Sequence, residues 1–511
     1  MIRGNKNMHI AFISNNYENL GIEYISSFLK RAGHKTSLIF EPGLFGSFFL
    51  HNNNFHRWLN FDKAIIGAVK GLNPDIVAFS VISDNYSWAV GIAKRIKQEN
   101  EGVTIVFGGI HPTSVPEYVM QNDFVDFSVV GEGEEAMVEL ANALEKHNKP
   151  IKIPNLAFRE DGKIKINKVR PPLDLNALPF PDKDLFFNEY EGMVSNSYMI
   201  LGSRGCVYNC SYCWNTVINK IYPSGIYFRR RSAENIIKEL LWAKERYGIK
   251  RVTFYDEIFT LDKLWLKQLL SLYQEKIRLP FFCCVHPSNC DEDVIGALTD
   301  AGCSTVNIGI QTIDANTRKV LLNRPENNTQ IIKSIQLLRK TNIFVYSNIM
   351  LGIPGQDEKE LLDNLYFCNR YKIDIPATYW LRYYPKTKII DILKEKSLLS
   401  GEVIKNIESG AIYSPYAMHG STYNKEMAKI GNLILMSGII PCKLMDIIIK
   451  YRLYRFLPSR NLLFPLILGV AIIKKFMQNK KFAFHYLSAV EYMHYYIFYL
   501  RRLLAEKASL K

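Results

Sequence analysis

Three cysteines lie close together in the segment Gly205-Cys206-Val-Tyr-Asn-Cys210-Ser-Tyr212-Cys213-Trp214. Thiolates are soft ligands that favour zinc or iron–sulfur centres. Structural zinc ions and ordinary [4Fe–4S] clusters take four protein ligands, so a trio would leave one metal position open for another ligand. The spacing alone keeps three hypotheses open: a cluster with an open iron, a structural zinc site, or a cluster completed by Cys283, Cys284 or Cys290.

The segment around these cysteines follows the first of six apolar runs that alternate with helical patterns. The expected strands are Tyr198 to Gly202, Arg251 to Tyr255, Phe281 to Val285, Thr305 to Ile310, Val345 to Leu351 and Thr378 to Arg382. Successive parallel strands joined by crossover helices predict a partial or full (β/α) barrel. The cysteines would then lie at the carboxyl end of the first strand, on the face where such barrels carry their active sites.

The first 150 residues predict a second α/β unit, a Rossmann-like, doubly wound parallel sheet. Ligands of such sheets bind beyond the carboxyl ends of the strands. The residues there that could contact a ligand are Ser80, Ser83, Gly108, Gly109, His111, Gly131, Glu132 and Gly133. Paired glycines let a large ligand approach the backbone. No Gly-x-Gly-x-x-Gly follows the first strand, which disfavours a dinucleotide.

The whole chain divides by pattern into four parts. We expect a ligand-binding domain at 1–150, a linker rich in Pro and Asp at 151–195, the barrel at 196–400 and a helical, basic region at 401–511. Nine cysteines, an odd number, argue against a disulfide framework. The N-terminus carries no long apolar leader, so we expect a reducing, cytoplasmic compartment.

The positive charge of the chain is concentrated at its end. The net charge is +15, and residues 421–511 hold 15 Lys and Arg against 4 Asp and Glu, interleaved with aromatic residues. Three interpretations remain: a helical cap over the barrel mouth, peripheral contact with an anionic membrane surface, or RNA binding. We do not expect nucleic acid, because no RNA-binding fold signature is present. The apolar run Leu462 to Ile473 is shorter than the roughly 20 residues of a membrane-spanning helix.

The C-x3-C-x2-C spacing, with Tyr212 before the last cysteine, resembles the signature of the radical S-adenosylmethionine (SAM) superfamily. The resemblance implies a [4Fe–4S] cluster on the three cysteines, whose open iron chelates SAM. One-electron reduction, by a donor such as flavodoxin or ferredoxin, would cleave SAM to methionine and a 5′-deoxyadenosyl radical.

Segments downstream resemble the SAM-binding turns of that superfamily. Asp256 and Glu257 stand where the family's acidic turn meets the SAM amino group, and Gly309 and Gln311 stand in a segment near the ribose. Gln311 replaces the usual Glu. Gly352 and Pro354 resemble the Gly-x-Pro-Gly turn beside adenine, and His286 stands where many relatives have Arg.

Residues 8–145 resemble the B12-binding domain found in one large radical SAM subgroup. Related mutase domains place a cobalt-ligating His in an Asp-x-His-x-x-Gly motif after the first strand. Here the segment Asn16-Tyr-Glu18-Asn-Leu-Gly21 keeps only the Gly. We therefore expect no cobalt ligand from this loop. His111 could ligate cobalt, or could contact the backbone or the corrin edge.

Together these resemblances imply a cobalamin-dependent radical SAM methyltransferase that methylates an unactivated carbon of a small molecule, which the basic, aromatic C-terminal region suggests is apolar or lipid-like. Two alternatives remain. One is a radical SAM cyclase that resembles the anaerobic magnesium-protoporphyrin ester cyclases and forms rings in tetrapyrrole or lipid synthesis. The other, from a different class, is a non-catalytic iron–sulfur or B12-binding sensor.

Overall fold

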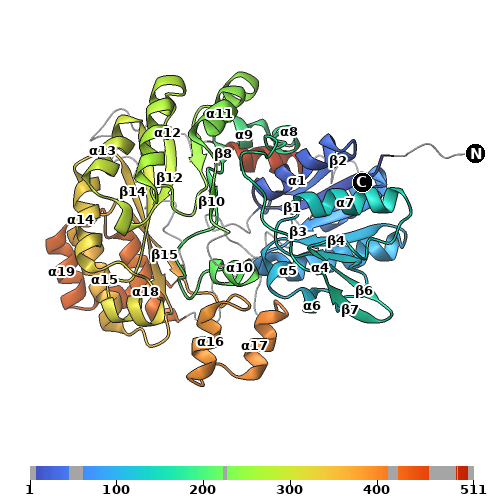
Figure 1. The fold of residues 1–511 in the computed structure, drawn as a ribbon. Helices are drawn as coiled ribbons and strands as arrows, with labels where there is room; N and C mark the ends of the chain where they lie inside the picture. Colours follow the sequence, from blue (N-terminus) through green and yellow to red (C-terminus); the bar gives the residue numbers. More distant parts are fainter. Residues whose placement is uncertain are drawn as a thin grey trace, which may run out of the picture.

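The computed structural model describes residues 7–44, 61–222, 227–411, 424–459, 491 and 493–503. Figure 1 shows two α/β modules side by side, an N-terminal module and a central module, whose strands end toward the space between them. The arrangement confirms the predicted order of a doubly wound domain, a barrel and a helical C-terminal region.

The N-terminal module has a seven-stranded sheet with the order β2-β1-β3-β4-β5-β6-β7. Its strands are β1 (His9–Asn15), β2 (Lys35–Glu41), β3 (Ile76–Ser80), β4 (Thr104–Gly108), β5 (Phe127–Val129), β6 (Leu156–Glu160) and β7 (Lys163–Ile166). The first five are parallel, and the order reverses direction between β1 and β3. A ligand is expected at such a switch point.

Helices cover both faces of this sheet, as a doubly wound fold requires. One apolar cluster joins one face to α1 (Leu20–Arg31) and α7 (Glu134–Glu145). A second cluster joins the other face to α3 (Asp62–Leu72) and α4 (Tyr86–Glu99). The shorter elements η1 (Ser83–Asn85), α5 (Ile110–Ser114) and α6 (Pro116–Val119) follow β3 and β4 directly. They place polar residues at the carboxyl edge of the sheet.

The central module is a partial barrel of six parallel strands with the order β15-β14-β13-β12-β11-β8. Its strands are β8 (Tyr198–Ile200), β11 (Val252–Phe254), β12 (Phe281–Val285), β13 (Cys303–Gln311), β14 (Phe344–Leu351) and β15 (Ile375–Trp380). The outer helices are α11 (Ala233–Tyr247), α12 (Lys263–Lys276), α13 (Glu292–Asp300), α14 (Asn328–Arg339) and α15 (Glu358–Arg370). Within the described residues, β8 and β15 do not pair to close the barrel.

One strand of the barrel begins and ends earlier than expected. The sequence predicts a strand from Thr378 to Arg382, but β15 ends at Trp380. Arg382 instead forms an ion pair with Asp84 of the N-terminal module, and Tyr384 also contacts that carboxylate. A partner in the other module, which local propensity does not reveal, ends this strand.

Residues 151–195 do more than link the modules. They supply β6 and β7, which pair antiparallel at the edge of the first sheet, and then α8 (Asp184–Phe187) and α9 (Glu191–Ser195). Lys183, which is fully buried, forms ion pairs with Glu18 at 2.5 Å and with Glu23 at 2.8 Å. Its ammonium also lies 4.8 Å from the ring centre of Tyr198 in β8. One side chain therefore joins this segment to both modules.

The described part of the C-terminal region is helical, as expected. It comprises α16 (Lys388–Glu395), α17 (Gly401–Glu408), α18 (Lys425–Met436), α19 (Cys442–Lys450), η4 (Leu453–Phe456) and a helix at 493–503. Helix α18 packs on β15 and α15, while 493–503 packs on the N-terminal module through Tyr499. The run Leu462 to Ile473 lies outside the described residues. Within them, no helix has both the length and the apolar character to span a bilayer.

Candidate active site

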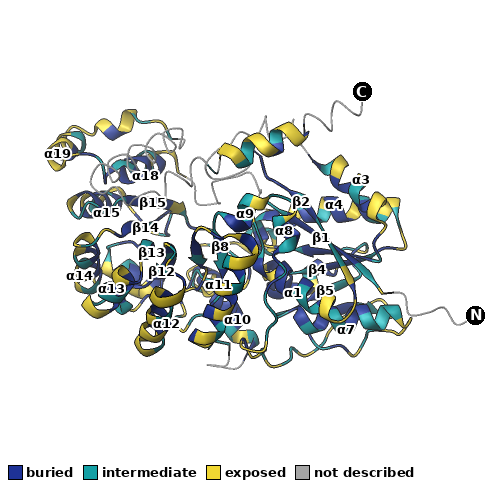
Figure 2. Cartoon of the chain, turned by 90° about the horizontal axis from the view of Figure 1, so that it is seen from above, coloured by how far each residue is buried: buried dark blue, intermediate teal, exposed yellow. Residues whose placement is uncertain are grey.

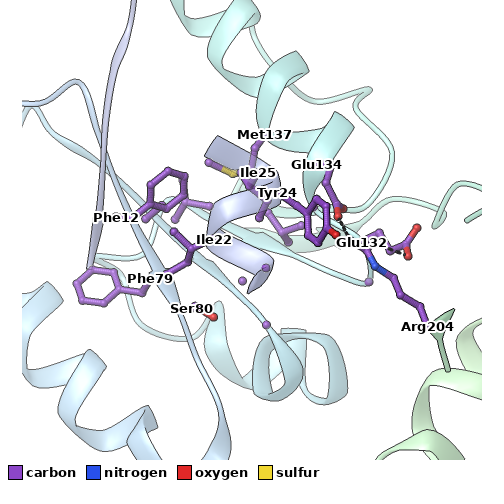
Figure 3. A pocket seen from close by; sticks show the side chains of 18 of the residues that line it. Phe12, Ile22, Tyr24, Ile25, Phe79, Ser80, Glu132, Glu134, Met137 and Arg204 are labelled. Atoms are coloured by element: carbon purple, nitrogen blue, oxygen red, sulfur yellow. Dashed lines mark hydrogen bonds and ion pairs between the residues drawn. The ribbon is translucent and has the colours of Figure 1, made fainter. Parts of the chain in front are cut away.

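An apolar cavity of about 220 Å³ opens at the switch point of the first sheet. Figure 3 shows Phe12, Phe79, Ile22, Ile25 and Met137 around it, contributed by the sheet and by α1 and α7. An engineered apolar cavity of about 150 Å³ holds benzene, so this one is large enough for an aromatic base. The lining also contains five glycines, Gly21, Gly108, Gly109, Gly131 and Gly133, together with Ser80 and Glu132.

Two of these glycines are required by their surroundings. Gly109 has φ 107°, and a β-carbon there would lie 2.7 Å from the carbonyl oxygen of Val81. Gly131 has φ 79°, and a β-carbon would lie 2.5 Å from the hydroxyl of Tyr222 in the barrel module. Any side chain at either position would therefore clash. The loops predicted to contact a ligand thus pass close to other parts of the protein, the Val81 backbone at Gly109 and the Tyr222 side chain at Gly131.

Two predicted ligand contacts do not line this cavity. His111 is fully buried in α5, its ring centre lies 4.2 Å from that of Tyr86, and its Nδ1 forms a hydrogen bond of 2.9 Å with the Ser83 hydroxyl. Burial lowers the pKa of His111 to about 4. The structure thus buries His111 and Ser83 against each other, outside the lining of this cavity.

Buried His111 makes a pH-dependent contribution to stability. Its neutral form is favoured when folded, whereas the unfolded chain takes up a proton below about pH 6.5, so this contribution is complete above that pH and declines toward pH 4. We expect the free energy of unfolding to fall by roughly 2 kcal/mol more in the wild type than in His111→Gln between pH 7.5 and 5, measured by urea titration. His147→Gln, at an exposed position, should lose as much free energy of unfolding between pH 7.5 and 5 as the wild type does. An equal loss in all three proteins would contradict the assignment of this pH dependence to His111.

The loop between β1 and α1 is held by polar contacts rather than by a histidine. Glu18, at the position of the mutase His, is bound to Lys183. Asn19 accepts a hydrogen bond from the Ile22 backbone N–H at 3.1 Å and donates one to the Ser80 hydroxyl at 3.0 Å. These contacts fix the loop beside Gly21 and Ser80, which line the cavity.

The three cysteines of the predicted cluster loop lie between the two strands of an antiparallel ribbon, β9 (Ser203–Arg204) and β10 (Arg229–Arg230). The Cys213 backbone N–H donates to the Cys210 carbonyl at 2.9 Å, and α10 (Asn215–Ile221) begins immediately after. Burial raises the pKa of the Cys206 thiol to about 11 and that of Cys213 to about 12, and it also raises the pKa of Cys210. Thiolates in such a place need a compensating cation, which iron provides.

A buried polar network holds this loop from both ends. Arg324, which the sequence analysis missed, donates to the Tyr212 hydroxyl at 3.1 Å, to the Gly309 carbonyl at 2.7 Å and to Glu326 at 2.6 Å. Glu326 lies 3.3 Å from His286, whose ring stacks on Tyr208 at 4.3 Å. Tyr208 and Tyr212 both belong to the cysteine loop. The charged pair on either side of Pro325, in the connection between the predicted ribose segment and the next helix, is the signal that could have pointed to Arg324.

The two adjacent acidic residues after β11 have different surroundings. Asp256 is buried, and it accepts hydrogen bonds from the Gly202 backbone N–H at 3.0 Å and from the Ser203 hydroxyl. It therefore fixes the turn that leads into the cysteine loop. Glu257 is exposed, and its charge acts on Cys206 and Cys213. Only Glu257 presents its carboxylate to the space beside the cysteines.

The remaining predicted SAM-binding residues lie around the same loop. Gln311 follows a register shift in β13 and has φ 65°, which marks a bulge. The Gly352 backbone N–H donates to the Gln356 side chain at 2.9 Å, which fixes the turn that contains Pro354. Tyr212 packs against an apolar cluster that includes Met350 and Ile353 of that segment. The structure thus brings the predicted adenine and ribose segments to the cysteine loop.

The cysteine loop is also bonded to the N-terminal module on both sides. Arg204, two residues before Cys206, forms ion pairs with Glu132 at 2.9 Å and Glu134 at 2.6 Å. Trp214, directly after Cys213, donates its indole N–H to Ser114 of α5 at 3.0 Å. These contacts join loops at the carboxyl ends of both sheets. The cysteines and the apolar cavity therefore face one space between the modules.

The other cysteines are engaged elsewhere. Cys283 is fully buried near Cys303, and Cys290 is also buried. Cys284 accepts a hydrogen bond from Asn307. Among the residues that the structure describes, no three His, Cys, Asp or Glu side chains converge on a single metal ion. A [4Fe–4S] cluster requires no such convergence, because each thiolate binds a different iron.

Comparison with known families decides the class of this site. Residues 200–368 match the model of the radical SAM superfamily, and residues 9–141 match that of the B12 binding domain. The chain is a radical SAM protein with a B12-binding domain. Its cofactors are accordingly a [4Fe–4S] cluster, SAM and cobalamin, as the sequence predicts.

Relatives of this radical SAM protein include methyltransferases and a cyclase. An uncharacterized methyltransferase of Pyrococcus horikoshii is 28% identical over 335 residues, which cover 65% of this chain and 72% of the relative. The anaerobic magnesium-protoporphyrin IX monomethyl ester cyclase of Synechocystis is 26% identical, covering 60% of this chain and 61% of the cyclase. The radical SAM methyltransferase TsrM of Kitasatospora setae shares the fold, with a TM-score of 0.61 at 17% identity, covering 76% of this chain and 75% of TsrM.

The residues present suit these cofactors. Three free thiols on one loop provide the soft donors that a cluster needs, and Glu257 would place a carboxyl group near the SAM amino group. The glycine-rimmed apolar cavity would hold the aromatic base of cobalamin. No histidine of the β1–α1 loop is available to cobalt, because the loop contains none.

Proposed function

We propose that this protein is a cobalamin-dependent radical SAM methyltransferase that methylates an unactivated carbon of a small molecule. The observation that carries the proposal is the direct bonding of the cysteine loop to the B12-binding domain, through Arg204 and Trp214. A substrate between the modules would meet both reactive cofactors without diffusing between them. The cysteine loop and the N-terminal loops that it contacts, which lie at the carboxyl ends of the two sheets, would exclude water from a radical intermediate.

Each site residue then has a role in this proposal. Cys206, Cys210 and Cys213 hold the cluster, and Glu257 binds the SAM ammonium. Tyr212, Gly309, Gln311, Gly352 and Pro354 surround the nucleoside part of SAM. Ser80, Gly108, Gly109, Gly131 and Gly133 line the cobalamin site, and Glu132 acts mainly through its bonds to Arg204 and Arg229. Asp256, Ser83 and His111 are positioning residues.

The chain's own contribution is binding, orientation and protection. When bound, the cluster supplies the electron that splits SAM into methionine and a 5′-deoxyadenosyl radical, and cobalamin carries the methyl group. The Arg324 network fixes the loop that holds the cluster, while Asp256 fixes the turn before it. Ion pairs between Arg204 and Glu132 and between Arg382 and Asp84 hold the modules in register. These contacts fix the position of one module relative to the other, and so would fix the positions of the groups that each module holds.

We also propose a role for each part of the chain, together with an electron donor and a membrane as its partners. We assign cobalamin binding to 1–150, the linking segment to 151–195, radical chemistry to 196–400 and the basic helical region to 401–511. An electron donor such as flavodoxin or ferredoxin would reduce the cluster, and residues 421–511 would make peripheral contact with a membrane. An apolar or lipid-like substrate agrees with that contact.

Two products of SAM test this proposal without knowledge of the substrate. The reconstituted protein, with cobalamin and titanium(III) citrate under strict anoxia, should release 5′-deoxyadenosine and also S-adenosylhomocysteine, which remains when SAM gives up its methyl group. Omitting cobalamin should suppress only S-adenosylhomocysteine, by at least tenfold, as measured by mass spectrometry. If a fully reconstituted cluster yields neither product, the enzyme assignment is wrong and a sensor role gains support.

A ring-forming cyclase is the second candidate, favoured by the similarity to the Synechocystis cyclase. Ring closure does not use the SAM methyl group. Release of 5′-deoxyadenosine with no S-adenosylhomocysteine would therefore favour the cyclase. With a substrate in hand, a gain of one CH2 mass unit per turnover would identify methyl transfer.

A further inference from the structure

Helix α19 and the turn η4 present large apolar side chains to solvent. The exposed fractions are 47% for Leu444, 48% for Ile447, 63% for Tyr451, 43% for Leu453 and 86% for Phe456. Leu444, Ile447 and Tyr451 are spaced i, i+3 and i+7, which places them on one side of the helix. The outward side of this segment, which we call the α19 face, is therefore apolar, the reverse of the usual pattern for a surface helix.

The α19 face belongs to an anchored element. Met445 and Tyr454 point into the protein and are buried, and the Tyr454 hydroxyl donates to Glu358 of α15. Asn432 of α18 donates to the Pro458 carbonyl at 2.5 Å directly after η4. Because the inward side is fixed by these contacts, the apolar residues on the other side cannot turn inward without breaking them. Exposed apolar area of this kind usually marks an interaction surface.

Cations surround the apolar side chains. Residues 441–458 contain Lys443, Lys450, Arg452 and Arg455 but only one acidic residue, Asp446. The helix at 493–503 repeats the combination, with Met493, Ile497 and Phe498 exposed by 57%, 46% and 40% beside two arginines. Figure 2 shows α19 and this helix on the same, upper side of the view, both with exposed residues.

We propose that the α19 face docks on an anionic lipid bilayer, with its apolar side chains among the acyl chains and its cations at the phosphates. Apolar residues with a cationic rim are the chemistry of helices that lie in the membrane interface. A protein partner would also cover apolar area, but the excess of cations on both helices specifies an extended anionic surface. The inference assigns to one face the membrane contact proposed for 421–511, and it does not depend on the methyl-transfer proposal.

Vesicle flotation with the full chain tests the docking. Vesicles of phosphatidylcholine and phosphatidylglycerol (7:3) should carry the wild type, and pure phosphatidylcholine vesicles should carry at least tenfold less. Ile447→Ser/Phe456→Ser should lose at least tenfold in partitioning to the anionic vesicles. Leu264→Ser, which removes a side chain that is 84% exposed on α12, should bind as the wild type does. Absence of wild-type binding, or unchanged binding of the double variant, would overturn the proposal.

Maleimide labelling of Phe456→Cys, followed by peptide mass spectrometry, identifies what covers the face. In buffer its rate should match that of Leu264→Cys, and anionic vesicles should slow only Phe456→Cys, by tenfold or more. Slow labelling in buffer at any protein concentration would mean that another segment of this chain covers the face. Slow labelling only at high concentration would indicate a second copy. Either result would overturn bilayer docking, while SAM cleavage, assayed separately, would be unaffected.

Discussion

Cys210→Ala is expected to abolish cluster assembly and SAM cleavage. Cys210 is the most buried thiol of the trio, and its loop is held by Ser211, whose hydroxyl donates to the Leu321 carbonyl at 2.5 Å. The surrounding loop should therefore stay in place while one of three ligands is lost. Loss of residues that merely orient ligands already costs about 10–100-fold in metal affinity or activity, so we expect a decrease of more than about 100-fold.

Iron content, the absorbance of the oxidised cluster and 5′-deoxyadenosine release measure this outcome. Cys442→Ser is the matched control, because Cys442 is exposed at the start of α19, far along the chain from the trio. It should retain wild-type iron and activity. A Cys210→Ala protein that still binds four irons and cleaves SAM at the wild-type rate would refute the assignment of the cluster ligands.

Lys183→Met is expected to reduce the free energy of unfolding by about 3–5 kcal/mol, the usual effect of removing one partner from a buried ion pair. Burial opposes the charge of Lys183, but Glu18 and Glu23 outweigh this effect and raise its pKa. Burial raises the pKa of Glu23 well above its usual range, and Glu18 adds to the increase. The single ammonium thus offsets negative charge on a buried pair of carboxyl groups. Methionine would leave that pair buried without a cation.

The midpoint of thermal unfolding at pH 7.5 measures this effect. For a module of this size the midpoint falls by about 2–4 °C per kcal/mol, so we expect Lys183→Met to lower it by more than roughly 6 °C. Lys359→Met is the control, because its pair with Asp363 has a Lys side chain that is 81% exposed and should contribute less than about 1 kcal/mol. Adding Glu18→Gln and Glu23→Gln to Lys183→Met should restore most of the loss. A midpoint no lower than that of Lys359→Met would show that the buried triad is not stabilising.

Local sequence pattern was sufficient to predict most of the fold. The predicted strand Phe281 to Val285 agrees residue for residue with β12. Buried parallel strands are nearly continuous apolar runs, which makes them visible in sequence. The strands β6 and β7 were not predicted, because β7 alternates Lys and Ile at an exposed sheet edge and resembles a polar linker.

The sequence by itself determined the chemistry of this protein: three thiols at a fixed spacing, glycine-rich loops after the strands and the missing histidine are all local features. Only the tertiary structure decided which of these groups meet. In the folded chain Asp256 accepts a hydrogen bond from the Gly202 backbone, whereas Glu257 faces the cysteines. Folding also buries His111. It brings Arg324 and Lys183 to partners more than 100 residues away in the chain. These pairings form because a buried charge without a partner is energetically costly. Which residues become buried together depends on long-range packing, so local sequence patterns do not predict the pairs.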